Sequence, residues 1–212
     1  PLVTLAKGIG LKACINRFYG AGLWSKRVTF YTDTDELTKQ HNALSPIRFI
    51  TAPIPFRHEN IKEPVTSPYT AEPINIVYLG DARSEKGYQY LPQLVDALWF
   101  SHIQPGKVKF TIQSNFNLPG GEPGMQEARL RLEQYPSHKV CLLKEPLSTE
   151  AYYELLSSAD IVVIPYLPDC YAVRSSGVLV ESLAAGKPVV VPAKSWMANQ
   201  VDESRASIYK SP

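Results

Sequence analysis

Segment 169–192, DCYAVRSSGVLVESLAAGKPVVVP, places a single carboxylate inside a run of small and apolar residues. This acid, Glu181, follows Gly177 by four residues, and the chain enters the run through Arg174. Four residues make about one helical turn, so a helix that begins at Gly177 carries Glu181 on the same side as its N-terminus. Packing a helix on a strand requires neither residue, so the pattern indicates a ligand site.

The predicted helix start has the chemistry of an anion site. A helix N-terminus presents free backbone N–H groups and the positive end of the helix dipole. Gly177 lets a ligand approach the backbone, and the hydroxyls of Ser175 and Ser176 can donate hydrogen bonds. Glu181, an acceptor only at neutral pH, suits ligand hydroxyls. This is the layout of a sugar nucleotide; the alternative is an ordinary helix acid favoured by the dipole.

A second candidate is segment 80–87, GDARSEKG, a glycine-led turn that enters a helix. Its backbone N–H groups suit phosphate, and Arg83 and Lys86 add two cations. The spacing is neither GxGxxG nor GxxxxGK[ST], so dinucleotide-binding and P-loop motifs are not supported. The alternative is a solvated, charged loop between a strand and a helix.

Both segments follow predicted buried strands. Continuous apolar runs predict strands at 74–80, 107–114, 139–144, 160–166 and 187–192. Apolar spacing predicts helices at 91–98, near 125–135, from Ser148 or Thr149 through Ala159, and from Gly177 to a stop at Gly186. This alternation predicts an α/β fold with a doubly wound parallel sheet. Ligands of such sheets bind outside the carboxyl ends of the strands, here the loops after Leu79, Gln113, Leu143 and Tyr166.

Residues 1–73, which precede this domain, show a weaker pattern of strands and helices. Residues 52–73 are rich in proline and polar residues without periodicity, which predicts an interdomain linker at 56–73. Strands at 27–33 and 47–55 flank a helix that Asp33 can cap, with Glu36 completing a capping box. We therefore expect residues 1–55 to be the tail end of a second α/β domain whose beginning is missing. The main domain is assigned to 74–212, with truncation at its end left open.

Composition excludes several function classes. The 212 residues carry a net charge of +2, which makes nucleic acid a poor partner. No apolar run is long enough to cross a bilayer. The three cysteines form no CxxC pair, so we expect reduced thiols in a cytoplasmic protein and no metal site. Neither the histidines nor the tryptophans are assigned a role.

Three segments together resemble a known family. They are YLGDARSEKG…LPQLVDAL, CLLKEPLSTEAYYELLSSADIVVIPY and SGVLVESLAAGKPVVVP. Over about residues 74 to 195 the chain resembles the C-terminal, donor-binding domain of GT-B glycosyltransferases, of the retaining group 1 class often found in bacterial polysaccharide or lipopolysaccharide synthesis. Segment 30–55 resembles the end of the family's N-terminal acceptor domain and its linker.

The resemblance implies a Rossmann-like domain in a retaining glycosyltransferase that uses a nucleotide-sugar as substrate and needs no cofactor. The acceptor would be a sugar or lipid-linked sugar, held by the missing domain. Through that domain we expect peripheral association with the inner face of the membrane. The chain alone is expected to bind donor and to be inactive in transfer.

The family's residue roles transfer by position. Lys86 falls on the lysine that contacts the donor diphosphate, and Arg83 substitutes for an arginine that the family usually has at the position of Asp81; these two are the predicted catalytic residues. Glu181 falls on the acid that holds the ribose hydroxyls. Val173 stands where the family often has a glutamate facing the donor sugar, which leaves the sugar open. The predicted donor-binding residues are Gly80, Asp81, Lys144, Leu147, Arg174, Ser175, Ser176, Gly177, Val178 and Glu181, with the backbone of 144–147 reading the base.

Three alternatives remain. The departures at Asp81 and Val173 are compatible with a non-catalytic nucleotide-binding module of the same fold. A sugar-nucleotide epimerase or a phosphorylase shares the architecture, but no pyridoxal phosphate lysine is identified. A receiver or flavodoxin-like binding protein fits the alternation of strands and helices, but not the segment around Glu181.

Overall fold

The computed structural model describes residues 29–44, 48–55, 73–202, 204 and 206–210, together with isolated positions 10, 13, 14, 17, 59 and 61. The chain divides into two compact units. One is Pro1–Pro55 with Val173–Ser175, and the other is Phe56–Ala172 with Ser176–Pro212. Most of the predicted linker at 56–73 lies outside the described residues. The two units are therefore described separately.

Over residues 29–44 and 48–55, the small unit contains two short parallel strands and one helix. Strands β1 (Phe30–Thr32) and β2 (Phe49–Thr51) pair in register, and α2 (Asp35–Leu44) connects them. The predicted cap of this helix is wrong: Thr34 Oγ1, not Asp33, accepts a hydrogen bond from Leu37 N at 3.1 Å. The helix begins at Asp35, two residues after Asp33, which makes Thr34 the capping residue and leaves Glu36 too early for a capping box.

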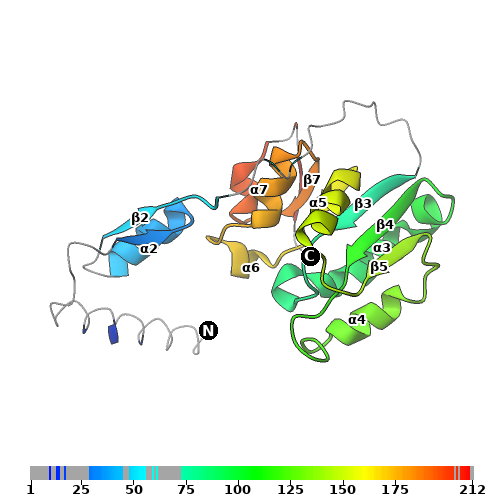
Figure 1. Ribbon diagram of the computed structural model, residues 1–212, viewed down its shortest axis with the longest axis horizontal. Coiled ribbons are helices and arrows are strands. Elements are labelled where there is room, and N and C mark those ends of the chain that lie inside the picture. The colour runs from blue at the N-terminus through cyan, green and yellow to red at the C-terminus, as the bar shows by residue number, and fades with distance from the viewer. Residues whose placement is uncertain are drawn as a thin grey trace. The chain divides into compact units, whose positions relative to one another are not determined.

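The large unit is built on a six-stranded, all-parallel sheet (Figure 1). Its strand order is β5-β4-β3-β6-β7-β8. The strands are β3 (Ile74–Tyr78), β4 (Val108–Gln113), β5 (Val140–Leu143), β6 (Ile161–Val163), β7 (Val189–Pro192) and β8 (Ala206–Tyr209). The five predicted strands are present, and the predicted α/β fold with a parallel sheet is confirmed. Strand β8 was not predicted.

Helices cover both faces of this sheet. Side chains of successive strand residues point to opposite faces, so neighbouring residues pack against different helices. Val77 packs in one core cluster with residues of α5 (Thr149–Ser158) and α7 (Gly177–Ala184). The next residue, Tyr78, packs in another with residues of α3 (Leu91–Leu98) and α4 (Met125–Leu132). The remaining helical segments are η2 (Ser84–Lys86), η3 (Tyr88–Tyr90), the π-helix η4 (Trp99–Ile103), α6 (Pro168–Tyr171) and η5 (Met197–Gln200).

The order of the strands reverses at β3. From β3 the chain moves outward through β4 and β5, and it returns to the other side of β3 with β6, β7 and β8. In open sheets of this kind, ligands bind at such a switch point, outside the carboxyl ends of the strands. The two segments that the sequence marks, 80–87 and 169–177, follow β3 and β6. The fold therefore positions segment 80–87 and the part of the second segment that belongs to the large unit, residues 169–172 and 176–177, at the switch point.

No helix in the described ranges combines the length and the apolar character that a bilayer span requires.

Candidate functional site

The loops after β3 and β6 are in direct contact. Gly87 has a left-handed φ of 70°, and a Cβ placed on it would lie 1.7 Å from the carbonyl oxygen of Pro165. Close by, Leu167 N donates a hydrogen bond to Glu85 O at 3.0 Å. Only glycine permits both this φ and this approach. Segment 80–87 is therefore anchored against the loop that leads to α7.

The two predicted cations of this segment share one carboxylate. Lys86 Nζ lies 2.5 Å from Asp81 Oδ1, and Arg83 Nε lies 3.0 Å from Asp81 Oδ2. Arg83 also reaches Glu85 Oε1 at 3.3 Å. The Lys86 ammonium lies over Gly80, where a Cβ would come within 2.9 Å of it. Both cations of the predicted phosphate turn are thus already paired with acids of the same segment, which the spacing of the residues does not indicate.

Asp81 is charged at neutral pH. Burial raises the pKa of this carboxyl, but the hydrogen bond and charge of Lys86, with the charge of Arg83, outweigh burial and lower the pKa below its ordinary value. A bound anion would therefore compete with Asp81 for the same two cations.

The loop after β4 supports the loop after β3. Gln113 Oε1 accepts a hydrogen bond from Gly80 N at 2.7 Å, and Asn115 O accepts one from Ala82 N at 2.8 Å. Glu122 Oε2 accepts from both the backbone N (2.8 Å) and the hydroxyl (2.6 Å) of Ser84, and these bonds lower the pKa of Glu122. The end of β4 and the loop after it thus hold the loop after β3 at the carboxyl edge.

The two residues at the start of α7, Ser176 and Gly177, differ in their surroundings. Ser176 is only 3% exposed, and its Oγ caps the helix by accepting from Leu179 N at 3.3 Å. Its hydroxyl therefore holds the helix start instead of reaching outward, which corrects the expected role of this side chain. At Gly177 a Cβ would meet no described atom within 4 Å. The backbone there remains accessible.

Glu181 has partners within the protein that the sequence analysis missed. Its carboxylate accepts a hydrogen bond from the phenol of Tyr152 at 2.5 Å and another from that of Tyr153 at 3.2 Å. Both tyrosines lie on α5, whose predicted N-cap Ser148 accepts from Ala151 N at 3.2 Å. The available signal was the pair of adjacent phenols.

The other predicted residues lie in several places. Lys144 is exposed and pairs with Glu133 at 2.7 Å, while Leu147 and Val178 pack against the core. Arg174 and Ser175 belong to the small unit, where the Ser175 hydroxyl donates to Asp33. The site of the large unit therefore consists of Gly80, Asp81, Arg83, Lys86, Ser176, Gly177 and Glu181, with Tyr152 and Tyr153 added.

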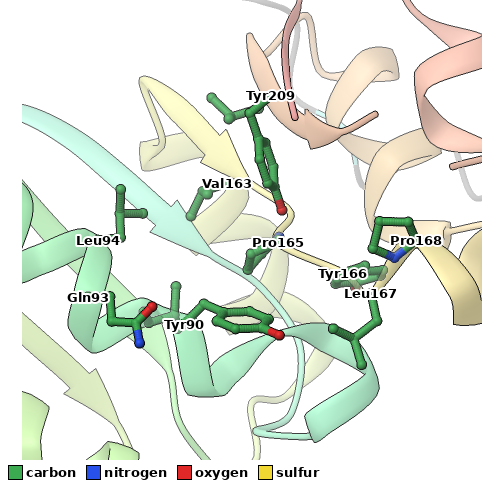
Figure 2. A pocket seen from close by; sticks show the side chains of 11 residues that line it. Tyr90, Gln93, Leu94, Val163, Pro165, Tyr166, Leu167, Pro168 and Tyr209 are labelled. Atoms are coloured by element: carbon green, nitrogen blue, oxygen red, sulfur yellow. The ribbon is translucent and has the colours of Figure 1, made fainter. Parts of the chain in front are cut away.

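A cavity of about 400 Å³ borders the loop after β6, with Pro165 and Leu167 in its lining (Figure 2). It is mainly apolar, and its lining includes Tyr90, Leu94, Val163, Pro165 and Tyr209. A large apolar cavity is the default ligand site of an unknown protein. However, none of the predicted site residues lines it, and its lining includes no charged side chain. We therefore place the candidate site at the loops of the switch point and not in this cavity.

The sequence matches no protein-family model and no curated protein. The structure is similar to several solved glycosyltransferases. HepE from Anabaena, in complex with UDP and glucose, aligns with a TM-score of 0.65 at 14% identity, covering 96% of this chain and 53% of that one. Sucrose-phosphate synthase from Thermosynechococcus elongatus aligns with a TM-score of 0.60 at 18% identity, covering 86% of this chain and 45% of that one. The C-terminal domain of the group 1 glycosyl transferase LpcC from Francisella tularensis aligns with a TM-score of 0.50 at 14% identity, covering 74% of this chain and 80% of that one.

The chain spans about half the length of the first two of these relatives. At such low identities the likeness shows the fold alone. The chain has the fold of the C-terminal part of a GT-B glycosyltransferase, which confirms the resemblance seen in the sequence.

Proposed function

We propose that this chain carries the donor-binding half of a glycosyltransferase, which transfers a sugar from a nucleotide-sugar to an acceptor. The observation that carries the proposal is the pairing of two features at one switch point. A loop with two cations follows β3, and an open helix start with a carboxylate one turn later follows β6. HepE, which shares the fold, is in complex with UDP and glucose.

In this proposal the diphosphate of the donor binds Lys86, Arg83 and the backbone at Gly177. The ribose hydroxyls donate to the carboxylate of Glu181, and the backbone of 144–147 contacts the base. The diphosphate displaces Asp81 from the two cations on binding, because the diphosphate and the carboxylate compete for the same donors, Lys86 and Arg83. No cofactor is required.

The proposed chemistry depends on charge at the leaving group. When the bond between the sugar carbon and the diphosphate oxygen breaks, negative charge grows on that oxygen. Cations and backbone N–H groups already aimed at this position stabilise the charge, which is usually the largest contribution to such catalysis. The sugar then joins an acceptor hydroxyl with retention of configuration. The acceptor site, and any base that takes the proton of the acceptor hydroxyl, lie on the N-terminal domain of the proposed enzyme.

The finer assignment belongs to the same proposal. It includes a role in bacterial polysaccharide or glycolipid synthesis, a sugar or lipid-linked sugar as acceptor, and a cytoplasmic location at the inner face of the membrane. It rests on the resemblance of the three sequence segments to the group 1 class.

A non-catalytic nucleotide-binding module is the second candidate. Two observations favour it: Asp81 neutralises the cations that should face the diphosphate, and Val173 stands where the family often has an acid facing the sugar. Such a module would bind a nucleotide without turnover.

Calorimetric titration of the full chain with UDP, GDP and ADP tests nucleotide binding. One of the three should bind, and Lys86→Ala should weaken that binding by roughly 10- to 100-fold, the worth of a charged hydrogen bond. Lys139→Ala is the matched control, because Lys139 is a partly exposed lysine that precedes β5 at the opposite edge of the sheet. If no nucleotide binds at millimolar concentration, the donor-site proposal fails. Tight binding without release of nucleoside diphosphate by the full-length protein, given acceptor, favours the module.

A further inference from the structure

The carboxylate of Glu181 accepts hydrogen bonds from two tyrosine side chains. Tyr152 OH donates to Oε2 at 2.5 Å, and Tyr153 OH donates to Oε1 at 3.2 Å. The two rings are perpendicular, with centroids 5.3 Å apart and an interplanar angle of 89°. Neighbouring residues of a helix point about 100° apart, so one helix, α5, delivers both phenols to a single group on α7. Each carboxylate oxygen thus has its own donor.

The tyrosines are suited to hold this acid without neutralising it. Burial, followed by the hydrogen bond and charge of Glu181, raises the pKa of Tyr152 far above its ordinary value, so the phenol stays a donor. A phenol supplies one proton to the bond and no net charge. The carboxylate therefore keeps its charge and its remaining acceptor capacity.

The two phenols do not use the full acceptor capacity of the Glu181 carboxylate. A carboxylate has about four lone-pair positions, of which the two phenols use one on each oxygen. One position on each oxygen remains, and two adjacent hydroxyls of a sugar ring are spaced to occupy such a pair.

Fixing the carboxylate in advance matters for affinity. A free glutamate side chain loses rotamer freedom when it is immobilised by a ligand, and a group already held avoids that loss at the moment of binding. Glu181 is half-buried on α7, and α5 holds it from the side. The orientation of the carboxylate is thus a property of the folded protein before any ligand arrives.

We infer that Tyr152 and Tyr153 are positioning residues that orient Glu181 to accept hydrogen bonds from both hydroxyls of a ribose, and so select ribonucleotides over 2′-deoxyribonucleotides. The inference rests on the proposed donor site, which already places the ribose at Glu181, and adds to it the two tyrosines that hold the carboxylate. Tyr152 contributes more than Tyr153, because its hydrogen bond is shorter.

The test compares UDP with 2′-deoxy-UDP by calorimetry on the full chain, with the GDP and ADP pairs run alongside. Wild type should prefer the ribonucleotide of the bound pair by about tenfold or more. Tyr152→Phe should weaken ribonucleotide binding by about tenfold and deoxynucleotide binding by less, because the deoxynucleotide keeps only its 3′-hydroxyl for Glu181, so that the preference falls. Tyr153→Phe should reduce the preference by a smaller factor.

Tyr135→Phe is the matched control, because the Tyr135 phenol also donates to a carboxylate, that of Asp96, away from the site. It should leave the preference intact. Equal weakening of both nucleotides by Tyr152→Phe would show a merely structural role and overturn the inference, as would no change in either. If wild type binds both forms equally, the ribose assignment fails while the donor site stands. If wild type binds no nucleotide, the proposed function fails and this inference with it.

Discussion

Replacing Gly87 by alanine tests the contact on which the site depends. Gly87 joins the loop after β3 to the loop after β6, and its missing side chain leaves space for the Pro165 carbonyl. An alanine Cβ would lie 1.7 Å from that oxygen and 2.6 Å from its carbon, and neither is a flexible side-chain end. The two loops must therefore separate if the variant is to fold.

The cost has two parts that a second glycine separates. A left-handed φ costs roughly 1–2 kcal/mol for a residue with a Cβ, and forcing extra volume into a packed region costs roughly 1–3 kcal/mol more. Gly120 has nearly the same φ, 76° against 70°, but a Cβ there would meet no described atom within 4 Å. Gly120→Ala should therefore show only the first cost and Gly87→Ala both.

Urea denaturation of the two variants measures the difference. We expect the free energy of unfolding of Gly87→Ala to lie about 1–3 kcal/mol below that of Gly120→Ala. UDP binding should fall with it, because Lys86 sits next to the displaced residue. Equal free energies of unfolding for the two variants would refute the close approach of the loops.

Three further outcomes are expected. Asp81→Asn should bind UDP severalfold more tightly in calorimetry, because the diphosphate no longer competes with a carboxylate for Lys86 and Arg83; weaker binding would mean that Asp81 instead positions Lys86. The pKa of Asp81 is lowered in the folded state, so the stability of wild type over Asp81→Asn should be fully present above about pH 4 and be lost as pH falls through the lowered value; a difference in unfolding free energy that is constant from pH 6 to pH 2 would contradict this. Ser148→Ala should destabilise the protein by about 1 kcal/mol in urea denaturation, because it removes the cap of α5, and an unchanged midpoint would argue against that cap.

The central strands could be predicted because each is an apolar run that ends at glycine, proline or polar loop residues. Val77, Val162 and Val189 are buried on a sheet that helices cover on both faces, and such strands appear as continuous hydrophobic stretches. Strand β8 lacks this signal. It lies at the edge of the sheet, and its two middle residues, Ser207 and Ile208, are exposed. Its pairing depends on β7, which no local pattern of four residues can indicate.

The candidate site was predicted where one residue carries the chemistry and missed where partners come from elsewhere in the chain. Glu181 was singled out because an acid inside an apolar run needs a reason. Its contacts with Tyr152 and Tyr153 bridge nearly thirty residues and arise only from the packing of α5 beside α7. Similarly, the spacing of Asp81 and Lys86 does not fix a salt bridge, which requires the particular turn that Gly80 allows.

A crystal structure of the chain with bound UDP tests the central claim most directly. We predict the diphosphate within hydrogen-bonding distance of Lys86 and of the backbone at Gly177, Asp81 separated from Lys86, and the ribose hydroxyls on Glu181. UDP bound in the apolar cavity beside Tyr90 and Tyr209, with the Lys86–Asp81 pair intact, would contradict the account.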